Sequence, residues 1–465
     1  MSVFDTSPIA PSGSTTQLDA IVKAYDIRGT VPDQLDADVA HALGVAFASF
    51  TKAQHLIVAH DMRPSGPDLV DAFARGVMEQ GVDVVLLGLA STDLLYYAAG
   101  KLDAPGAMFT ASHNPAQYNG VKLCLSGARP VGADTGLSEI KAAAQAVLDG
   151  GGPPPAERAG RSTSRNLLSA FVDHVISFID VDNLRPMRVV ADTANGMGGL
   201  VVPAVFERLP LIDLEVMYGE LDGTFPNHPA DPLQPANQRD LQARVVSGDF
   251  DIGLAFDGDA DRVFVVDELG RGISGSTTTA ILASSVLRKN PGSTVLYNLI
   301  CSRAVPEVIR ENGGIPIRTR VGHSIIKQVM AETGAVFGGE HSAHYYFRDN
   351  YRADSGLIAT MLMLDEVSRA QLDLSVLRQP YERYSSSGEI NTQVDDPAAV
   401  IGIVAEHFSS STQDHLDGLT VDCGPWWFNL RPSNTEPLLR LNLEAPNRDE
   451  CDQHVAELLS LITSV

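Results

Sequence analysis

A strand–helix–strand unit recurs three times along this chain. Each copy has a short apolar strand, a helix whose apolar residues are spaced near 3.6, and a second strand that ends on glycine. The copies span residues 55–88, 188–219 and 294–322. Strands that are almost continuously Val, Ile and Leu are buried on both faces, which is typical of parallel strands joined by crossover helices. The pattern predicts an α/β fold with three similar mixed α/β domains.

The last part of the chain follows a different pattern. Strand-like segments at 419–422, 427–430 and 438–443 precede a helix at 448–462, which predicts a smaller α+β domain. A Ser-, Thr- and Pro-rich start and a Gly-Gly-Gly-Pro-Pro-Pro stretch mark a flexible tail and a linker. The expected parts are a tail (1–17), domain 1 (18–150), a linker (151–164), domain 2 (165–270), domain 3 (271–380) and domain 4 (381–465).

The composition excludes some classes of ligand. The chain has 465 residues, with 58 Asp and Glu against 34 Lys and Arg, and a formal net charge of −24. A nucleic-acid partner would need a basic face, so we expect none. A small anion is compatible with this charge, because one arginine, a metal ion or the N–H groups at a helix start can hold a phosphate.

The four cysteines lie far apart without a Cys-x-x-Cys pair, which fits a reducing compartment rather than a zinc site or a disulfide framework. The N-terminal segment lacks the layout of a signal peptide, and no apolar run reaches about 18 residues. We therefore expect a cytoplasmic protein with no membrane segment. A monomer or a weak dimer is the expected oligomeric state.

The most specific motif is Asp257-Gly-Asp-Ala-Asp-Arg262, directly after an apolar strand at 252–256. Its carboxylates, Asp257, Asp259 and Asp261, project to one side of an extended loop, and so much like charge needs a divalent cation. A set of oxygen ligands selects a hard ion, and we expect Mg²⁺. Because α/β proteins bind ligands at the carboxyl ends of their strands, a merely solvated acidic turn is disfavoured.

A calcium loop of EF-hand type is the sharper alternative. The acidic residues at its positions 1, 3, 5 and 12 would be Asp257, Asp259, Asp261 and Glu268. That loop needs Gly at position 6, where this chain has Arg262, and residues 263–266 are strand-like rather than helical. The pattern therefore favours magnesium.

A serine stands at the tip of a second loop, Thr110-Ala-Ser-His-Asn-Pro115, which follows the apolar segment 106–109. Ser112 can act as a nucleophile or as a phosphate carrier. A serine hydrolase is disfavoured, because the Gly-x-Ser-x-Gly elbow is missing and His113 is poorly placed to serve as base for its own neighbour. A lone serine would more often cap a helix or a turn, but the accompanying motifs reverse that preference.

Two further loops complete the set. Arg431-Pro-Ser-Asn-Thr-Glu-Pro437 offers a guanidinium and two hydroxyls in a proline-stiffened loop, which suits a phosphate group. Gly338-Gly-Glu-His-Ser-Ala-His344 offers a carboxylate, a hydroxyl and imidazoles for sugar hydroxyls. Neither loop is specific alone, since Ser-Asn-Thr is also common turn composition. Together, one motif in each domain forms a complete site for phosphoryl transfer between hydroxyls.

In this order the four motifs resemble those of the α-D-phosphohexomutase superfamily, from about Leu18 to the C-terminus. The resemblance implies three similar α/β domains and a C-terminal α+β domain around one central cleft. It implies an isomerase that interconverts hexose 6-phosphate and hexose 1-phosphate through a phosphoserine at Ser112 and a 1,6-bisphosphate intermediate. One Mg²⁺ per chain, a hexose 1,6-bisphosphate activator and a phosphosugar substrate follow from the same resemblance.

The resemblance also implies roles for individual residues. The metal would be held by Ser112, Asp257, Asp259 and Asp261. Arg28 and Lys122 would stabilise charge on the transferring group, and the proton carrier would be Lys122, His323 or His344. The residues that would bind the substrate are Tyr25, His113, Arg262, Gly322, Glu340, Ser342, Arg431, Ser433, Asn434 and Thr435.

The sugar loop departs from a common pattern of the superfamily. Bifunctional phosphomannomutase/phosphoglucomutases usually carry Gly-Glu-Met-Ser-Gly-His where this chain has Gly-Glu-His341-Ser-Ala-His344. The variant resembles actinobacterial phosphomannomutases more than phosphoglucomutases or phosphoglucosamine mutases, which tend to have Glu or Gln at the position of His341. Mannose phosphate is the expected substrate, and glucose and glucosamine phosphates are the alternatives. The alternative from another class is a non-catalytic, metal-dependent sugar-phosphate binder, against which the intact Ser112 loop speaks.

Overall fold

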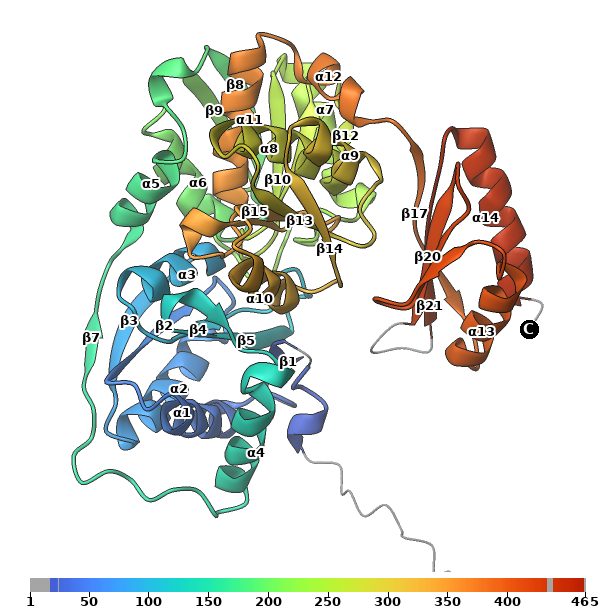
Figure 1. Cartoon of the computed structure of the whole chain (residues 1–465). Coiled ribbons are helices and arrows are strands. Elements are labelled where there is room, and N and C mark those ends of the chain that lie inside the picture. The colour runs from blue at the N-terminus through green and yellow to red at the C-terminus, as the bar shows by residue number, and fades with distance from the viewer. Residues whose placement is uncertain (1–16, 24, 433–437, 464–465) are drawn as a thin grey trace, which may run out of the picture.

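A computed structural model describes residues 17–23, 25–432 and 438–463. Three α/β domains, each built on its own sheet, pack together, and a fourth domain lies beside the third (Figure 1). The predicted N-terminal tail falls almost entirely outside these residues. Within the described ranges, no helix is long and apolar enough to cross a membrane.

Domain 1 is built on a seven-stranded sheet of order β1-β5-β4-β2-β3-β7, with β6 paired to β5. Helices α1, α2 and α4 cover one face, and α3 covers the other (Figure 1). Its elements are β1 (Ile27–Thr30), α1 (Ala37–Thr51), β2 (His55–His60), α2 (Gly66–Glu79), β3 (Asp83–Leu89), α3 (Thr92–Lys101), β4 (Gly106–Phe109), β5 (Tyr118–Leu125), β6 (Arg129–Pro130), α4 (Leu137–Leu148) and β7 (Ser162–Ser164). The end of the predicted linker is therefore an edge strand, β7, paired with β3.

Domains 2 and 3 repeat the plan on smaller sheets, of order β12-β11-β10-β8-β9 and β14-β13-β15-β16. Domain 2 contains α5 (Leu168–Ile176), β8 (Met187–Asp192), α6 (Gly198–Phe206), β9 (Ile212–Met217), α7 (Arg239–Gly248), β10 (Ile252–Phe256), β11 (Val263–Asp267) and β12 (Gly272–Ile273). Domain 3 contains α8 (Gly275–Lys289), β13 (Thr294–Asn298), α9 (Ala304–Glu311), β14 (Ile315–Thr319), α10 (His323–Thr333), β15 (Phe337–Gly339), β16 (Tyr345–Phe347), α11 (Gly356–Ala370) and α12 (Leu374–Leu377).

The three predicted strand–helix–strand units are confirmed as β2-α2-β3, β8-α6-β9 and β13-α9-β14, each with parallel strands. The sheets are mixed, because β5, β11 and β16 run antiparallel to the strand before them. The connections that lead into these strands are too short for a crossover, which takes a dozen or more residues.

Domain 4 has a five-stranded sheet of order β17-β21-β20-β19-β18. Its elements are β17 (Ser385–Gln393), α13 (Pro397–His407), β18 (Thr412–Asp414), β19 (Leu419–Asp422), β20 (Trp427–Pro432), β21 (Leu438–Ala445) and α14 (Arg448–Thr463). The three predicted strands and the last helix are confirmed. Strand β17 was not predicted, because it is largely polar and half-exposed and so lacks a clear hydrophobic pattern.

Two kinds of packing join the domains. One continuous apolar core extends from the α3 side of domain 1 through domains 2 and 3. Domain 4 has a core of its own, and a single segment leads into it from α12 (Figure 1). Its contacts with domain 3 include exposed ion pairs, such as Arg303 with Asp422 at 2.6 Å and Arg318 with Asp414 at 2.5 Å. Domains 1 to 3 thus form one packed body to which domain 4 is attached.

Candidate active site

All four motif loops occupy the same place in their domains. Each connects two antiparallel neighbours, namely β4 and β5, β10 and β11, β15 and β16, and β20 and β21. In the three α/β domains the loop follows the carboxyl end of the first strand of its pair, the edge of the sheet where α/β proteins bind ligands. The repeated fold therefore presents three loops of different chemistry from equivalent positions, and the antiparallel sheet of domain 4 adds the fourth.

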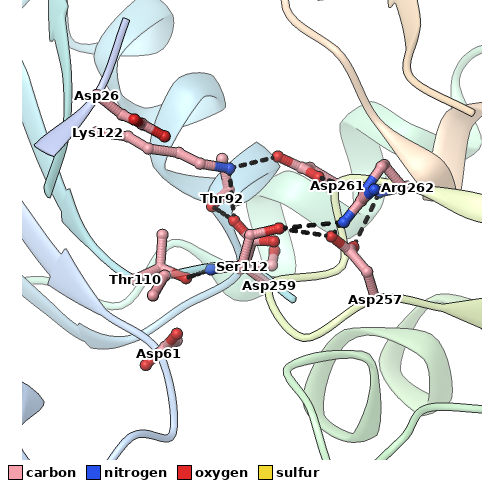
Figure 2. A network of polar contacts seen from close by, with 12 residues as sticks. Asp26, Asp61, Thr92, Thr110, Ser112, Lys122, Asp257, Asp259, Asp261 and Arg262 are labelled. Atoms are coloured by element: carbon pink, nitrogen blue, oxygen red, sulfur yellow. Dashed lines mark hydrogen bonds and ion pairs between the residues drawn. The ribbon is translucent and has the colours of Figure 1, made fainter. Parts of the chain in front are cut away.

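Ser112 stands in the connection after β4 with a φ of 50°, in the left-handed region that residues other than glycine rarely adopt. Its backbone N–H donates to Thr110 Oγ1 at 2.9 Å, and its hydroxyl donates to Asp257 Oδ2 at 2.8 Å. Only 3% of the residue is exposed. The Ser112 hydroxyl of domain 1 therefore points directly at the acidic loop of domain 2 (Figure 2).

The acidic loop brings Asp257, Asp259 and Asp261 together, with one oxygen of each within 4.8 Å of the others, and all three are buried. Lys122 Nζ contacts Asp259 Oδ2 and Asp261 Oδ2, each at 2.7 Å (Figure 2). Thr92 Oγ1 from domain 1 donates to the same oxygen of Asp259 at 2.5 Å. The loop is thus docked onto domain 1 through side chains of β5 and α3.

The donor set fits a divalent cation. Within the part of the chain that the structure describes, the second oxygens of Asp259 and Asp261 are buried without a hydrogen bond. A buried carboxylate oxygen without a partner costs free energy, and a hard cation would satisfy it. The three carboxylates therefore form a cluster that can hold a metal ion. The strand-forming residues after the loop, in β11, agree with the rejection of an EF-hand.

The protonation of this cluster is uneven. Burial raises the pKa of Asp257 to about 7, although Arg262 acts in the opposite direction. Burial also acts to raise the pKa of Asp259, but the charge and hydrogen bond of Lys122 outweigh it and hold that pKa below its usual value. For Lys122, burial is likewise outweighed by Asp259 and Asp261, which hold the pKa well above the usual range. Lys122 is therefore a buried cation.

Two more cations surround Ser112. Arg262 Nε donates to Asp257 Oδ2 at 2.9 Å, and its Nη2 contacts Nδ1 of His113. Arg28 Nη1 donates to Asn114 Oδ1 at 2.5 Å, in the same loop as Ser112. Burial, together with Arg262 and Arg28, holds the pKa of His113 well below its usual value, so this imidazole is neutral. The surroundings of the serine hydroxyl are suited to a doubly charged phosphate.

The sugar loop is built around Glu340, which is 2% exposed. Its carboxylate accepts the N–H of Gly322 at 3.2 Å and the hydroxyl of Tyr346 at 2.8 Å. Tyr25 of domain 1 lies against Gly322, since a Cβ on that glycine would stand 3.3 Å from the tyrosine ring. The structure thus brings Tyr25, Gly322 and Glu340 together, and Ser342 is half-buried in the adjoining turn.

His344 lies between the acidic loop and Asp354. Its Nδ1 lies 2.8 Å from Asp354 Oδ2 and 3.8 Å from Asp261 Oδ1. Burial lowers the pKa of His344, but Asp261 and Asp354 outweigh it and raise the pKa above the usual value. Asp354 in turn contacts the buried Lys327 at 2.7 Å. His323 is the first residue of α10, and its side chain is outside the described part of the structure.

The phosphate loop is described only at its ends. Arg431, in β20, donates from Nη2 to Glu389 Oε2 at 2.9 Å, and Arg440 of β21 lies 3.3 Å from the other oxygen of that carboxylate. The predicted ligands Ser433, Asn434 and Thr435 lie outside the described residues. A cavity of about 440 Å³ between domains 3 and 4 is lined in part by His341 of the sugar loop and Trp427 of β20.

Several residues around the site were not predicted from the sequence. Asp61 and Arg63 lie directly after β2, and Arg63 donates to the Ser112 carbonyl at 2.9 Å. Their position at the carboxyl end of a buried strand, where α/β proteins bind ligands, could have identified them from the sequence. Thr92 had no such signal, because its partner Asp259 is 167 residues away. Asp354 had none because nothing in its neighbourhood marks it as the partner of His344.

Comparison with known proteins agrees with this geometry. Family models described as phosphoglucomutase/phosphomannomutase alpha/beta/alpha domains I, II and III match residues 19–148, 169–270 and 274–384. The model for the C-terminal domain of the same family matches residues 389–461.

Similar curated proteins include a phosphohexose mutase of Xanthomonas campestris and a phosphomannomutase of Salmonella typhimurium. They are 40% and 38% identical to this chain, and each alignment covers 91% of this chain and 94% of the relative. A solved phosphoglucomutase/phosphomannomutase family protein of Burkholderia thailandensis superposes with a TM-score of 0.85 at 31% identity, over 96% of this chain and 98% of that one.

This chain belongs to the phosphoglucomutase/phosphomannomutase family. It is thus a phosphohexomutase, an isomerase that acts on phosphosugars. The predicted superfamily and fold class are confirmed.

Proposed function

We propose that this chain interconverts mannose 6-phosphate and mannose 1-phosphate through a phosphate carried on Ser112. Its intermediate and activator is a hexose 1,6-bisphosphate. The observation that carries the proposal is the 2.8 Å contact between Ser112 Oγ and Asp257 Oδ2, which places the serine hydroxyl at the carboxylate cluster. Mannose is favoured because relatives named phosphomannomutase, from Salmonella typhimurium and Escherichia coli, are each 38% identical to this chain.

The metal of this site is Mg²⁺, held by Asp257, Asp259, Asp261 and an oxygen of the phosphate on Ser112. The all-oxygen donor set and the buried carboxylate oxygens without hydrogen bonds support this choice. When bound, the ion supplies positive charge that offsets the negative charge of the transferring group.

The reaction begins with phosphate on Ser112 and a hexose monophosphate in the cleft. A free hydroxyl of the sugar attacks the phosphorus in line, its proton passes to a base, and the bond to Ser112 Oγ breaks as that oxygen regains a proton. Arg28, Lys122 and Arg262 stabilise the charge that spreads over the transferring group. The bisphosphate then turns end for end and returns its other phosphate to Ser112, which leaves the isomeric monophosphate.

The substrate is held from two sides. Glu340 and Ser342 bind ring hydroxyls of the sugar. Further contacts with the substrate come from Tyr25, Gly322 and His113. Arg431, Ser433, Asn434 and Thr435 hold the phosphate that is not reacting. A guanidinium suits this role because its planar donors match phosphate oxygens in pairs.

The proton carrier is one of Lys122, His323 and His344. Lys122 is a cation with a pKa held well above its usual range, which suits charge stabilisation better than proton abstraction. His344 is held by Asp354 through Nδ1, so that its ring has a defined orientation. We therefore favour His344.

The test combines mass spectrometry with three assays. Intact mass of the wild-type enzyme should show one phosphate, which is absent from the Ser112→Ala variant. Turnover of mannose, glucose and glucosamine 6-phosphates, measured side by side with bisphosphate present, should give the highest kcat/KM for mannose. A wild-type enzyme that never carries phosphate would instead support the non-catalytic binder, and a preference for glucose or glucosamine phosphate would correct the substrate.

A further inference from the structure

Arg63 is among the largest side chains that are completely enclosed in this protein, with 0% of its side chain exposed. It stands three residues after β2, next to the strand that leads into the Ser112 loop. A buried guanidinium is costly unless each of its donors is paired. The partners of Arg63 therefore indicate why an arginine is kept there.

All five N–H donors of the guanidinium are in use. Nε donates to Asp61 Oδ2 at 3.2 Å, which supplies the neutralising charge. The other four donors bind three backbone carbonyls of the connection between β4 and β5 and one at the start of β5, those of Ser112 at 2.9 Å, Asn114 at 2.7 Å, Pro115 at 2.8 Å and Tyr118 at 2.8 Å. One rigid planar group thus ties together the beginning and the end of the loop that presents Ser112.

The loop has a conformation that needs such support. Ser112 has a φ of 50°, and a residue other than glycine keeps this conformation only where surrounding contacts over-determine it. The Ser112 carbonyl also meets the acidic loop, since a Cβ on Gly258 would stand 2.4 Å from its oxygen. The carbonyl is therefore held between Arg63 on one side and the backbone of the acidic loop on the other.

Domain 2 covers the guanidinium. The ring of Phe225, in the connection between β9 and α7, lies 5.2 Å from Arg63 Cζ. The same connection approaches the backbone of Arg63 so closely that a Cβ on Gly223 would stand 2.6 Å from Arg63 Cα. An arginine over an aromatic face gains free energy, most of all where water is excluded. Two regions of domain 2, the acidic loop and this connection, thus meet the Ser112 loop.

We propose that Arg63 is a positioning residue for phosphoryl transfer, which holds the Ser112 loop in its strained conformation and aims Oγ at the metal-binding carboxylates. Phe225 of domain 2 completes this arrangement by enclosing the guanidinium. The inference rests on the proposed function, in which Ser112 carries the phosphate. Because the side chain of Arg63 is fully enclosed, it acts on the rate of transfer and not on the binding of the sugar.

The first test is Arg63→Lys, which keeps the charge but has three donors on a single nitrogen in place of the planar fork. A displacement of about 1 Å at a reacting group can cost about a hundredfold in rate. We expect kcat to fall by about that factor, with KM within about twofold of wild type, because no substrate contact changes. Hydrogen exchange of the backbone amides in residues 110–119 should become faster. Exchange of the amides in the other strands of domain 1 should be unchanged.

The second test keeps Arg63 and changes Phe225, the aromatic residue packed against its guanidinium. It applies even if the lysine variant does not fold. Phe225→Leu removes the aromatic face and should lower kcat by about three- to tenfold, while Phe225→Tyr should restore it. Phe250→Leu is the matched control, because Phe250 lies under Arg188 and Arg244 at the opposite end of β10 from Asp257. This control should leave kcat and KM unchanged.

The outcomes separate this inference from the function on which it rests. If the wild-type enzyme carries phosphate on Ser112 and both Arg63→Lys and Phe225→Leu have wild-type kcat, the role of Arg63 is refuted and the phosphoserine stands. An equal loss of kcat in Phe225→Leu and Phe250→Leu would also refute it, since it would show general destabilisation of domain 2. A wild-type enzyme without phosphate on Ser112 would overturn both proposals.

Discussion

The surroundings of Ser112 and the proposed phosphate-binding end in domain 4 are built in different ways. Around Ser112, the ion pairs of Lys122 with Asp259 and Asp261 are almost fully buried and join domain 1 to domain 2 above a shared apolar core. Domain 4 has a separate core, and its ion pairs with domain 3, such as Arg318 with Asp414, are about a third exposed.

The difference matters because the two kinds of ion pair differ in strength. Breaking a buried pair by removing one partner costs about 3–5 kcal/mol, whereas an exposed pair contributes about 0–1 kcal/mol. The residues proposed to transfer phosphate are therefore held rigidly, while those proposed to bind the non-reacting phosphate belong to a more loosely attached domain. A rigid centre beside a loosely attached domain suits a reaction whose bisphosphate intermediate must reorient within the site.

The largest effect is expected from Ser112→Ala, which removes the phosphate carrier at the rigid centre. Turnover should fall below about a hundredth of the wild-type rate while the fold is retained, since the hydroxyl is used in every cycle. Steady-state rates and circular dichroism measure the two quantities. Ser164→Ala, in the exposed strand β7, is the control and should be fully active. Retention of more than about a hundredth of the wild-type rate would refute the phosphoserine assignment.

Removal of the metal tests the same centre without a mutation. Activity should be lost in the presence of a chelator and return with Mg²⁺, and Mg²⁺ should raise the melting temperature by binding only the folded protein. Calcium should also raise the melting temperature but support little turnover, because its loose coordination positions oxygen ligands poorly. Full activity in Ca²⁺ alone would contradict the choice of ion.

Lys122→Met breaks the buried pairs and tests their contribution to stability. Without metal, the free energy of unfolding should fall by about 3–5 kcal/mol, because Asp259 and Asp261 lose their only lysine partner within the described structure. Urea denaturation measures this change. Mg²⁺ should restore part of the loss, since it neutralises the same carboxylates. A loss below about 1 kcal/mol would show that the centre is no more rigid than an exposed pair.

Arg431→Ala tests the distant end of the substrate. In the proposed reaction this residue holds the phosphate that is not reacting, so its contacts are similar in the ground and transition states, and KM should rise more than kcat falls. A charge-assisted hydrogen bond contributes about 1.5–3 kcal/mol, or about ten- to a hundredfold in KM. Arg208→Ala, which removes an exposed arginine paired with Asp173 in domain 2, is the control.

The same variant should also lose the bisphosphate intermediate more often. Each loss leaves Ser112 without phosphate and the enzyme inactive, so added sugar bisphosphate should partly restore the rate of Arg431→Ala. Product analysis by ³¹P NMR would detect the released bisphosphate. An unchanged KM together with no response to bisphosphate would remove Arg431 from the phosphate site.

The smallest effect is expected at the attachment of domain 4. Asp414→Asn removes the exposed ion pair with Arg318 and should change the free energy of unfolding by no more than about 1 kcal/mol. Urea denaturation of this variant beside Lys122→Met compares the two regions directly. Equal losses in the two variants would contradict the contrast between a rigid centre and a loosely attached domain.

Much of the fold and site could be predicted because the evidence was local. The strand–helix–strand units have apolar periods that can be read within about 35 residues, and the metal-binding carboxylates lie within Asp257 to Asp261 of one loop. Where the pattern was weak, as in the polar strand β17, the element was missed. Strands β5, β11 and β16 are antiparallel to the strand before them because the connections are short. The apolar pattern alone does not distinguish parallel from antiparallel strands.

The sequence by itself determined which chemical groups this protein has and the order in which they occur along the chain. Only the tertiary structure decided which of them meet: Thr92 with Asp259, Arg63 with the Ser112 loop, and His344 with Asp354. Asp93 of domain 1 similarly accepts the hydroxyl of Ser355 of domain 3 at 2.7 Å. These partners are 10 to 262 residues apart. They leave no local pattern, because each is chosen by the packing of the folded chain rather than by its immediate neighbours in the sequence.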